Sequence, residues 1–162
     1  MTFANLVILV VRYGLVILFF PASALDKIIN FKGAVGQAEE VFKAHWIAAL
    51  MILVGLFIEI VMPLAILTGF GDRLAAFIMA GYCAVTALLF KRFWEPGDFW
   101  KAGKSQARDT FWDFLKNFSL ASGFLLITVG IGGQAYKNFI DDPFASSHPY
   151  AGLARQPPGE TP

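Results

Sequence analysis

Two ionisable residues lie inside long apolar stretches, where a charge needs a physical explanation. Glu59 is near the middle of residues 46–70, WIAALMILVGLFIEIVMPLAILTGF, and Arg12 lies inside another apolar run, residues 6–25. A charge at the centre of a bilayer costs about 2.5 kcal/mol or more. Glu59 must therefore be protonated, paired with a cation on another helix, or directed into a polar cavity. We predict that Glu59 pairs with Arg12, directly or through water, because no other basic residue is expected at that depth.

This predicted pair has two interpretations, and the sequence alone leaves both open. Ionisable residues within a membrane are candidate functional sites by default, and in that case the pair would contact the head group of a ligand. Buried ion pairs also occur as purely structural features, and in that case the pair would only set the register of two helices.

A second group of polar and aromatic residues is predicted near one end of the helices. Trp, Lys and Arg favour the membrane interface, so anchoring alone explains the Trp and Lys members. Anchoring does not require Asp26, Lys116 or Asn117. We expect Asp26, Lys27, Lys116 and Asn117 to converge as a pocket for a ligand head group. The candidate site comprises Asp26, Lys27, Trp94, Trp112, Lys116 and Asn117.

The elements that must position these residues are apolar helices. Of the 162 residues, 57% are hydrophobic and 15% are charged, whereas about a quarter of a soluble domain is charged. A helix crosses a bilayer with roughly 20 residues. The sequence predicts an all-α, integral membrane four-helix bundle, antiparallel, over residues 1–135, and a polar, Pro-rich tail over residues 136–162 that is extended. The predicted helices cover about 6–25, 46–70, 74–92 and 110–133.

The distribution of basic residues predicts the orientation of this bundle. Four helices place both termini on one side and both long connections on the other. Basic residues gather on the connection side, which by the positive-inside rule faces the cytoplasm. We therefore expect cytoplasmic connections and both termini outside. The basic residues on the connection side are Lys27, Lys32, Lys43, Lys91, Arg92, Lys101, Lys104 and Arg108.

Several kinds of function find no support in the sequence. A net charge of +1 argues against a nucleic-acid partner. Cys83 is the only cysteine, which excludes an intramolecular disulfide and a thiolate cluster. His45 and His148 lie at or beyond helix ends, so no metal site is expected. No nucleophile–base set, phosphate loop or haem signature is visible. We expect no covalently bound cofactor and no independent enzymatic activity, but rather a non-catalytic subunit.

Six short motifs follow one another in an order and spacing typical of a known family. In this arrangement, over about residues 8–133, the chain resembles the DoxX family of small four-helix bacterial membrane proteins. The motifs are Arg12-Tyr13-Gly14, FFPASALDKI at 19–28, Glu59, Gly69 with Arg73, Phe93-Trp94, and Phe114-Leu115-Lys116-Asn117.

The resemblance implies a multi-pass protein of the bacterial cytoplasmic (inner) membrane that belongs to a redox system. One branch of the family is linked to thiosulfate oxidation with quinone as acceptor, and another to oxidative stress and thiol handling beside soluble enzymes. The implied role is an accessory subunit of a quinone-linked or thiol- or sulfur-linked oxidoreductase complex. Quinone is then a candidate ligand, and lipids and other membrane or peripheral redox subunits are the expected partners. Two alternatives remain: a small transporter or permease for an anion or weak acid, and a purely structural subunit.

The chain also departs from the family's pattern. Relatives often carry a His before the Phe-Trp pair, where this chain has Lys91-Arg92, and a Gly-Gly after the Glu, where it has Met62-Pro63. If that His handles protons or a ligand in relatives, this chain cannot do so in the same way.

Overall fold

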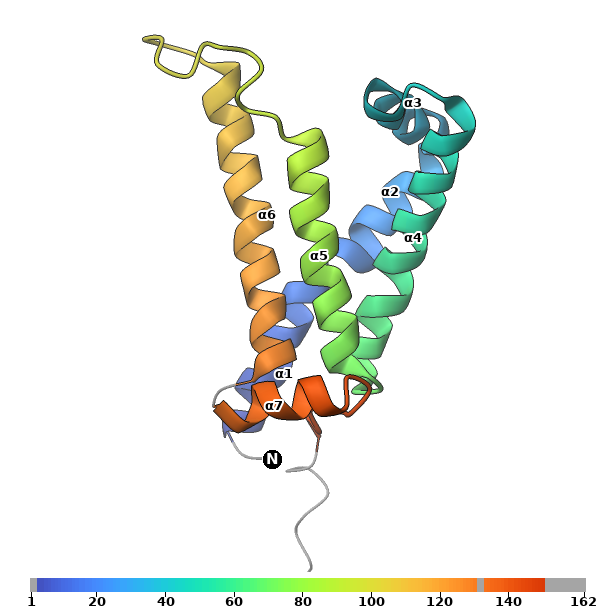
Figure 1. Cartoon of the computed structure of the whole chain (residues 1–162), viewed down its shortest axis with the longest axis vertical. Coiled ribbons are helices and arrows are strands. Elements are labelled where there is room, and N and C mark those ends of the chain that lie inside the picture. The colour runs from blue at the N-terminus through green and yellow to red at the C-terminus, as the bar shows by residue number, and fades with distance from the viewer. Residues whose placement is uncertain (1–2, 131–132, 151–162) are drawn as a thin grey trace, which may run out of the picture.

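The computed structural model describes residues 3–130 and 133–150, and every regular element within them is helical (Figure 1). The predicted all-α class is therefore confirmed for the described residues. The elements are α1 (Phe3–Val16), the π-helical segment η1 (Leu18–Ser23), α2 (Ala24–Ile29), α3 (Phe31–Phe42), α4 (His45–Thr68), α5 (Asp72–Phe90), α6 (Gln106–Val129) and α7 (Gly133–Asp141).

Three helical stretches of the described residues are long and apolar enough to cross a membrane. They are Leu6–Ile29, His45–Thr68 and Asp72–Phe90. Helix α6 has 24 residues, but its first half carries charged side chains such as Asp109 and Asp113. The chain is thus a helical protein with membrane-spanning segments.

The first predicted helix is broken into three pieces. At Phe20 the backbone leaves the helical region, with φ −120° and ψ 118°. Pro21 explains this, because proline disfavours the helical conformation of the preceding residue and lacks an amide donor of its own. The predicted helix end at residue 25 is wrong, since helical structure continues to Ile29. Lys27 consequently lies within the first candidate membrane-spanning stretch, two residues before its end at Ile29.

A tight turn joins α4 to α5 and makes them antiparallel neighbours, as the sequence predicted. Gly69 and Gly71 have φ values of 78° and 57°, which glycine adopts without steric cost. Figure 1 shows α5 and α6 side by side along most of their length.

Helix α6 begins where side chains satisfy its first amide groups. The Asp98 carboxylate accepts hydrogen bonds from the backbone N–H of Gln106 at 2.9 Å and of Ala107 at 3.0 Å, and Ser105 Oγ accepts one from the N–H of Arg108. These acceptors replace intrahelical partners that the first turn lacks. The 91–105 connection is thereby attached to the start of α6.

The helices pack tightly at one end and diverge at the other. We call the end with the α4–α5 turn and α7 the terminus end, and the end with α3 and residues 91–105 the connection end (Figure 1). A buried core that includes Val16, Ile66, Met79 and Phe124 holds the terminus half together. At the connection end a smaller cluster around Val35 packs α3 onto α4.

The sequence predicts an extended tail from residue 136, and this prediction is wrong for the first part of the tail, which is helical. Residues Gly133–Asp141 form α7, which crosses the terminus end of the bundle (Figure 1). Residues 142–150 then return over the α4–α5 turn, where Tyr150 donates a hydrogen bond from its hydroxyl to the Leu67 carbonyl. The prediction for residues 151–162 lies outside the described part of the chain.

Candidate functional site

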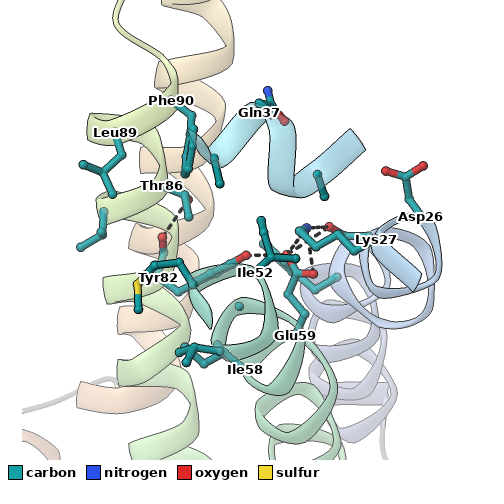
Figure 2. A pocket seen from close by; sticks show the side chains of 18 of the residues that line it. Asp26, Lys27, Gln37, Ile52, Ile58, Glu59, Tyr82, Thr86, Leu89 and Phe90 are labelled. Atoms are coloured by element: carbon teal, nitrogen blue, oxygen red, sulfur yellow. Dashed lines mark hydrogen bonds and ion pairs between the residues drawn. The ribbon is translucent and has the colours of Figure 1, made fainter. Parts of the chain in front are cut away.

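A cavity of about 990 Å³ lies between α2, α3, α4 and α5, where the helices diverge. Most of its wall is apolar, with Phe19, Ile52 and Ile58 among the lining residues, and polar side chains gather on one part of it (Figure 2). The cavity is large enough for a ligand, since ligand pockets usually enclose about 300–1,000 Å³.

Glu59 is the centre of the polar part. Only 2% of the residue is exposed, yet its carboxylate accepts several hydrogen bonds. Lys27 Nζ lies 2.9 Å from Oε1 and 3.0 Å from Oε2, and the Tyr82 and Ser23 hydroxyls donate to Oε1 at 2.8 and 3.0 Å. A carboxylate has about four acceptor positions. The buried charge is therefore both paired and well supplied with donors.

Four separate segments supply this cluster, which we call the Glu59 cluster: Ser23 from η1, Lys27 from α2, Glu59 from α4 and Tyr82 from α5 (Figure 2). Ser23 and Lys27 are one helical turn apart, and the Lys27 ammonium also donates to Ser23 Oγ at 2.8 Å. After the break at Phe20, α2 packs against α4, which brings Lys27 to Glu59.

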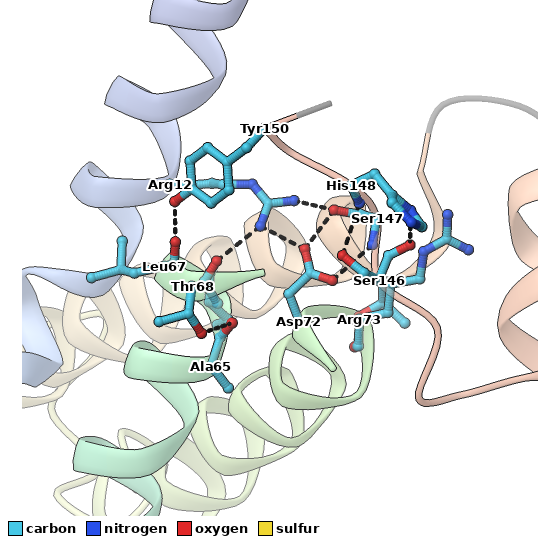
Figure 3. Close-up of polar contacts among 12 residues, drawn as sticks. Arg12, Ala65, Leu67, Thr68, Asp72, Arg73, Ser146, Ser147, His148 and Tyr150 are labelled. Carbon is cyan, nitrogen blue, oxygen red and sulfur yellow. Dashed lines mark hydrogen bonds and ion pairs between the residues drawn. The ribbon is translucent and has the colours of Figure 1, made fainter. Parts of the chain in front are cut away.

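The predicted pair between Arg12 and Glu59 is wrong. Arg12 Nη1 lies 2.7 Å from Asp72 Oδ2 and 3.0 Å from the Ile66 carbonyl oxygen (Figure 3). Ile66 is seven residues beyond Glu59 on α4, about 10 Å further along the axis at 1.5 Å per residue. Arg12 therefore meets the start of α5, and the carboxylate of Glu59 is neutralised by Lys27.

The Arg12–Asp72 pair closes the terminus end. Asp72 is 0% exposed, and Ser147 from the chain after α7 contacts both partners (Figure 3). The Ser147 backbone N–H donates to Asp72 Oδ1 at 2.8 Å, and its hydroxyl accepts from Arg12 and donates to Asp72 Oδ2. The buried ions thus have partners from α1, α4, α5 and the C-terminal segment.

The predicted head-group residues separate into two sets. Asp26, Lys27 and Asn117 all line the cavity. Their role in binding a ligand stays a prediction.

The other members lie elsewhere, so the predicted convergence is wrong for Lys116. Its ammonium pairs with Asp113 at 3.2 Å on an exposed face of α6. Trp94 and Trp112 are exposed, and Trp94 packs against Phe93 with ring centroids 5.1 Å apart. An aromatic cluster around the 91–105 connection accounts for these tryptophans.

Sequence reasoning did not assign Ser23, Tyr82 or Asp72 to a site. The i, i+4 spacing of Ser23 and Lys27 places them on one helical face, which is a usable signal. Tyr82 is a hydroxyl inside an apolar helix that lies beside the helix of Glu59, and this also could have been noticed. Asp72 gives no such signal, because an acidic residue directly after Gly71 fits the first turn of a helix without any role in a site.

Comparison with known proteins places these residues within a family. A family model described as DoxX matches residues 7–92, more than half of the chain. The matched segment includes all four members of the Glu59 cluster and both Arg12 and Asp72. No curated protein matches the chain, and no solved structure matches it. On the strength of the matched segment, the chain belongs to the DoxX family.

Proposed function

We propose that the protein is a ligand-binding membrane subunit of a redox complex, and that a quinone binds in the cavity beside Glu59. The observation that carries the proposal is the Glu59 cluster, a group of hydrogen-bonding side chains buried at the wall of a mainly apolar cavity. The protein itself is an accessory subunit, and the electron-transfer partner is another protein of the complex.

The chemistry of the cluster suits a quinone. A quinone head group presents two carbonyl acceptors. The Tyr82 hydroxyl and the Lys27 ammonium donate to Glu59 in the structure, and each would donate to a quinone carbonyl by giving up a hydrogen bond to Glu59. The reduced form presents hydroxyl donors, for which the Glu59 carboxylate is an acceptor. The aromatic rings of Phe19 and Phe90 line the same cavity and offer apolar surfaces to the ring of the ligand.

The cavity also suits a ligand that arrives from the lipid. Leu18, Val54 and Val85 line it and are exposed on the outer surface of the helices. A membrane would cover these side chains, so an apolar molecule could enter sideways between them.

The charge balance favours this proposal over a permease for an anion. Lys27 is neutralised by Glu59 at 2.9 Å, and Arg12 by Asp72 at 2.7 Å. Each ion pair therefore has no net positive charge with which to bind an anion. A neutral ligand with acceptor and donor groups is therefore preferred at the Glu59 cluster.

We further propose that α6 is a fourth membrane span of a bacterial inner-membrane protein, with the connection end in the cytoplasm. Its 24 residues are long enough, its second half is apolar, and it packs along α5. Basic residues outside the cavity remain concentrated at the connection end. Cysteines at the exposed positions Lys104 and Tyr136, in a Cys83→Ala background, test the orientation with an impermeant thiol reagent. Labelling of Tyr136→Cys alone in intact cells is expected, and labelling of Lys104→Cys alone would reverse the orientation.

Binding of decylubiquinone to the purified protein in detergent tests the main proposal. We expect saturable binding that raises Tm. The Tyr82→Phe variant should bind about fivefold more weakly, because one hydrogen bond contributes about 1 kcal/mol. Tyr13→Phe, at an exposed position outside the cavity, is the matched control and should bind as wild type.

Two results would contradict the proposal: absence of binding by folded protein, or equal loss of affinity in both Tyr→Phe variants. Purification from native membranes in mild detergent tests the subunit assignment separately. A redox enzyme in stoichiometric amounts supports it, and a protein that purifies alone contradicts it.

A further inference from the structure

A second cavity, of about 430 Å³, lies at the connection end beside the first. Its lining is mainly polar and includes Glu40 and Lys43 near the end of α3 and Arg92 and Glu95 after α5. Arg92 and Glu95 form an ion pair at 2.6 Å on this wall. We call this cavity the vestibule.

The vestibule and the cavity beside Glu59 share part of their walls. Gln37 of α3 and Leu89 and Phe90 of α5 line both of them. In Figure 2, Gln37 lies on α3, and Leu89 and Phe90 lie on α5 beyond Thr86 and Tyr82. We call these three shared side chains the partition, and Gln37 is its polar, exposed member.

Polar groups continue from the partition to Glu59. Asn30 and Lys27 line the cavity on the α2–α3 side, and Thr86 and Tyr82 line it on α5. The titratable groups that line the cavity with Glu59 are Asp26 and Lys27 on α2, Tyr82 on α5 and Lys91 after α5. Water that passes Gln37 would therefore find hydrogen-bonding partners down to the carboxylate.

The opposite direction is blocked. Ile66, Met79 and Phe124 are fully buried in the core on the terminus side of the cavity. Beyond them lie Arg12 and Asp72, whose polar groups are already occupied by each other and by Ser147. No comparable series of polar side chains joins Glu59 to the terminus end within the described residues.

We infer that the vestibule is the aqueous entrance of the cavity, so that the Glu59 cluster exchanges water and protons with the connection side only. This rests on the proposed function in one respect: a quinone gains or loses protons when its redox state changes, so its site needs a proton route. The geometry assigns that route to the shared wall at Gln37.

Side-specific thiol modification tests this inference. In a Cys83→Ala background, Thr86→Cys places a thiol on the cavity wall, and Ile52→Cys places a second one on α4. Lys104→Cys marks the connection side and Tyr136→Cys the terminus side. Each variant is treated with a charged, membrane-impermeant methanethiosulfonate in spheroplasts and in inverted membrane vesicles.

We expect Thr86→Cys and Ile52→Cys to react only in the preparation in which Lys104→Cys reacts. Adding Gln37→Trp should slow both cavity thiols at least tenfold, because the larger side chain fills the partition. Lys32→Trp, on α3 but outside both cavities, is the matched control and should leave the rates unchanged.

Three results would overturn the inference: modification from the Tyr136→Cys side, no modification of folded protein from either side, or unchanged rates with Gln37→Trp. A monodisperse elution profile in detergent establishes that each variant is folded. Labelling needs no quinone, so its failure is separable from a failure of decylubiquinone to bind.

Discussion

Lys27 and Glu59 form an ion pair at 2.9 Å across 32 residues of sequence. The two ends of the pair have different environments, because the side chain of Glu59 is 2% exposed and that of Lys27 is 21% exposed. The carboxylate is thus the fully buried partner, and the lysine reaches it along the cavity wall. Loss of Lys27 would leave the buried Glu59 carboxylate unpaired. This costs more than leaving the partly exposed Lys27 unpaired.

A double-mutant cycle on this pair should show strong coupling. We expect Lys27→Met and Glu59→Leu each to destabilise the protein, and the double variant Lys27→Met with Glu59→Leu to recover much of the loss. Breaking a fully buried pair costs about 3–5 kcal/mol in soluble proteins. Loss of Glu59 should cost less than loss of Lys27, because the lysine that Glu59 leaves behind is partly exposed. Thermal unfolding in detergent is the measurement. Additive single effects would mean that the two residues do not interact.

The Arg12–Asp72 pair should matter more to stability than the serine that bridges it. Arg12→Met leaves the fully buried Asp72 with only Ser147 among the partners described above, so a large loss of stability is expected. Ser147→Ala removes hydrogen bonds but keeps the ion pair, and should cost about 1 kcal/mol. Lys137→Met, at an exposed position of α7, is the control for loss of a positive charge. Equal Tm values for Arg12→Met and Lys137→Met would refute this account of the terminus end.

Two glycines on the cavity wall provide a matched test of the Tyr82 position. A Cβ at Gly55 would lie 3.1 Å from the Tyr82 hydroxyl oxygen, whereas a Cβ at Gly81 would meet nothing within 4 Å. Both changes to Ala gain the same helix propensity, about 1 kcal/mol. We expect Gly81→Ala to be neutral or stabilising. The Gly55→Ala variant should be about 1–3 kcal/mol less stable than Gly81→Ala, because the added methyl group disturbs the Tyr82–Glu59 hydrogen bond. The measurement is Tm of the two variants under the same conditions. Identical Tm values for Gly55→Ala and Gly81→Ala would argue against the contact between residue 55 and Tyr82.

The start of α6 should respond to acid through Asp98. The backbone N–H groups of Ala107 and Gln106 hold the pKa of the Asp98 carboxyl below its ordinary value. Because the pKa is lower in the folded state than in the unfolded state, the carboxylate stabilises the fold above the unfolded pKa. This contribution is lost as the pH falls through the folded pKa.

Asp98→Asn is therefore expected to lower Tm near neutral pH, with a difference from wild type that shrinks as the pH falls from about 4 to about 2, below the ordinary pKa of an Asp carboxyl. Asp141→Asn, at an exposed position of α7, is the control and should show no such convergence. A Tm difference that stays constant over this range would contradict the assignment of Asp98 as a charged cap.

The long apolar helices could be predicted because hydropathy and turn glycines are local signals. Predicted residues 46–70 and 74–92 correspond to α4 and α5, and residues 110–133 to α6, within about four residues at each end. Gly69 and Gly71 lie in the turn between α4 and α5. Helix α7 was missed because its polar sequence carries no membrane signal.

The partners of the buried charges could not be predicted from depth alone. Counting residues along an unbroken first helix placed Lys27 at the interface, whereas the break at Phe20 turns α2 back toward α4. Arg12 then meets Asp72, whose burial depends on Ser147, a residue of the chain beyond α7. These pairings depend on backbone direction and on contacts distant in sequence, which a periodic pattern does not encode.

The C-terminal segment changes what counts as the smallest unit that can be expressed and studied. The family match ends at residue 92, yet Ser147 lies more than fifty residues further on and hydrogen-bonds to Arg12 and Asp72. A shortened version cut at the end of the matched segment would lose α6 and expose two hydrogen-bonded ions. The segment that the family model matches is therefore shorter than the unit that holds these buried ions together, and fusion partners or crystallisation tags belong beyond residue 150.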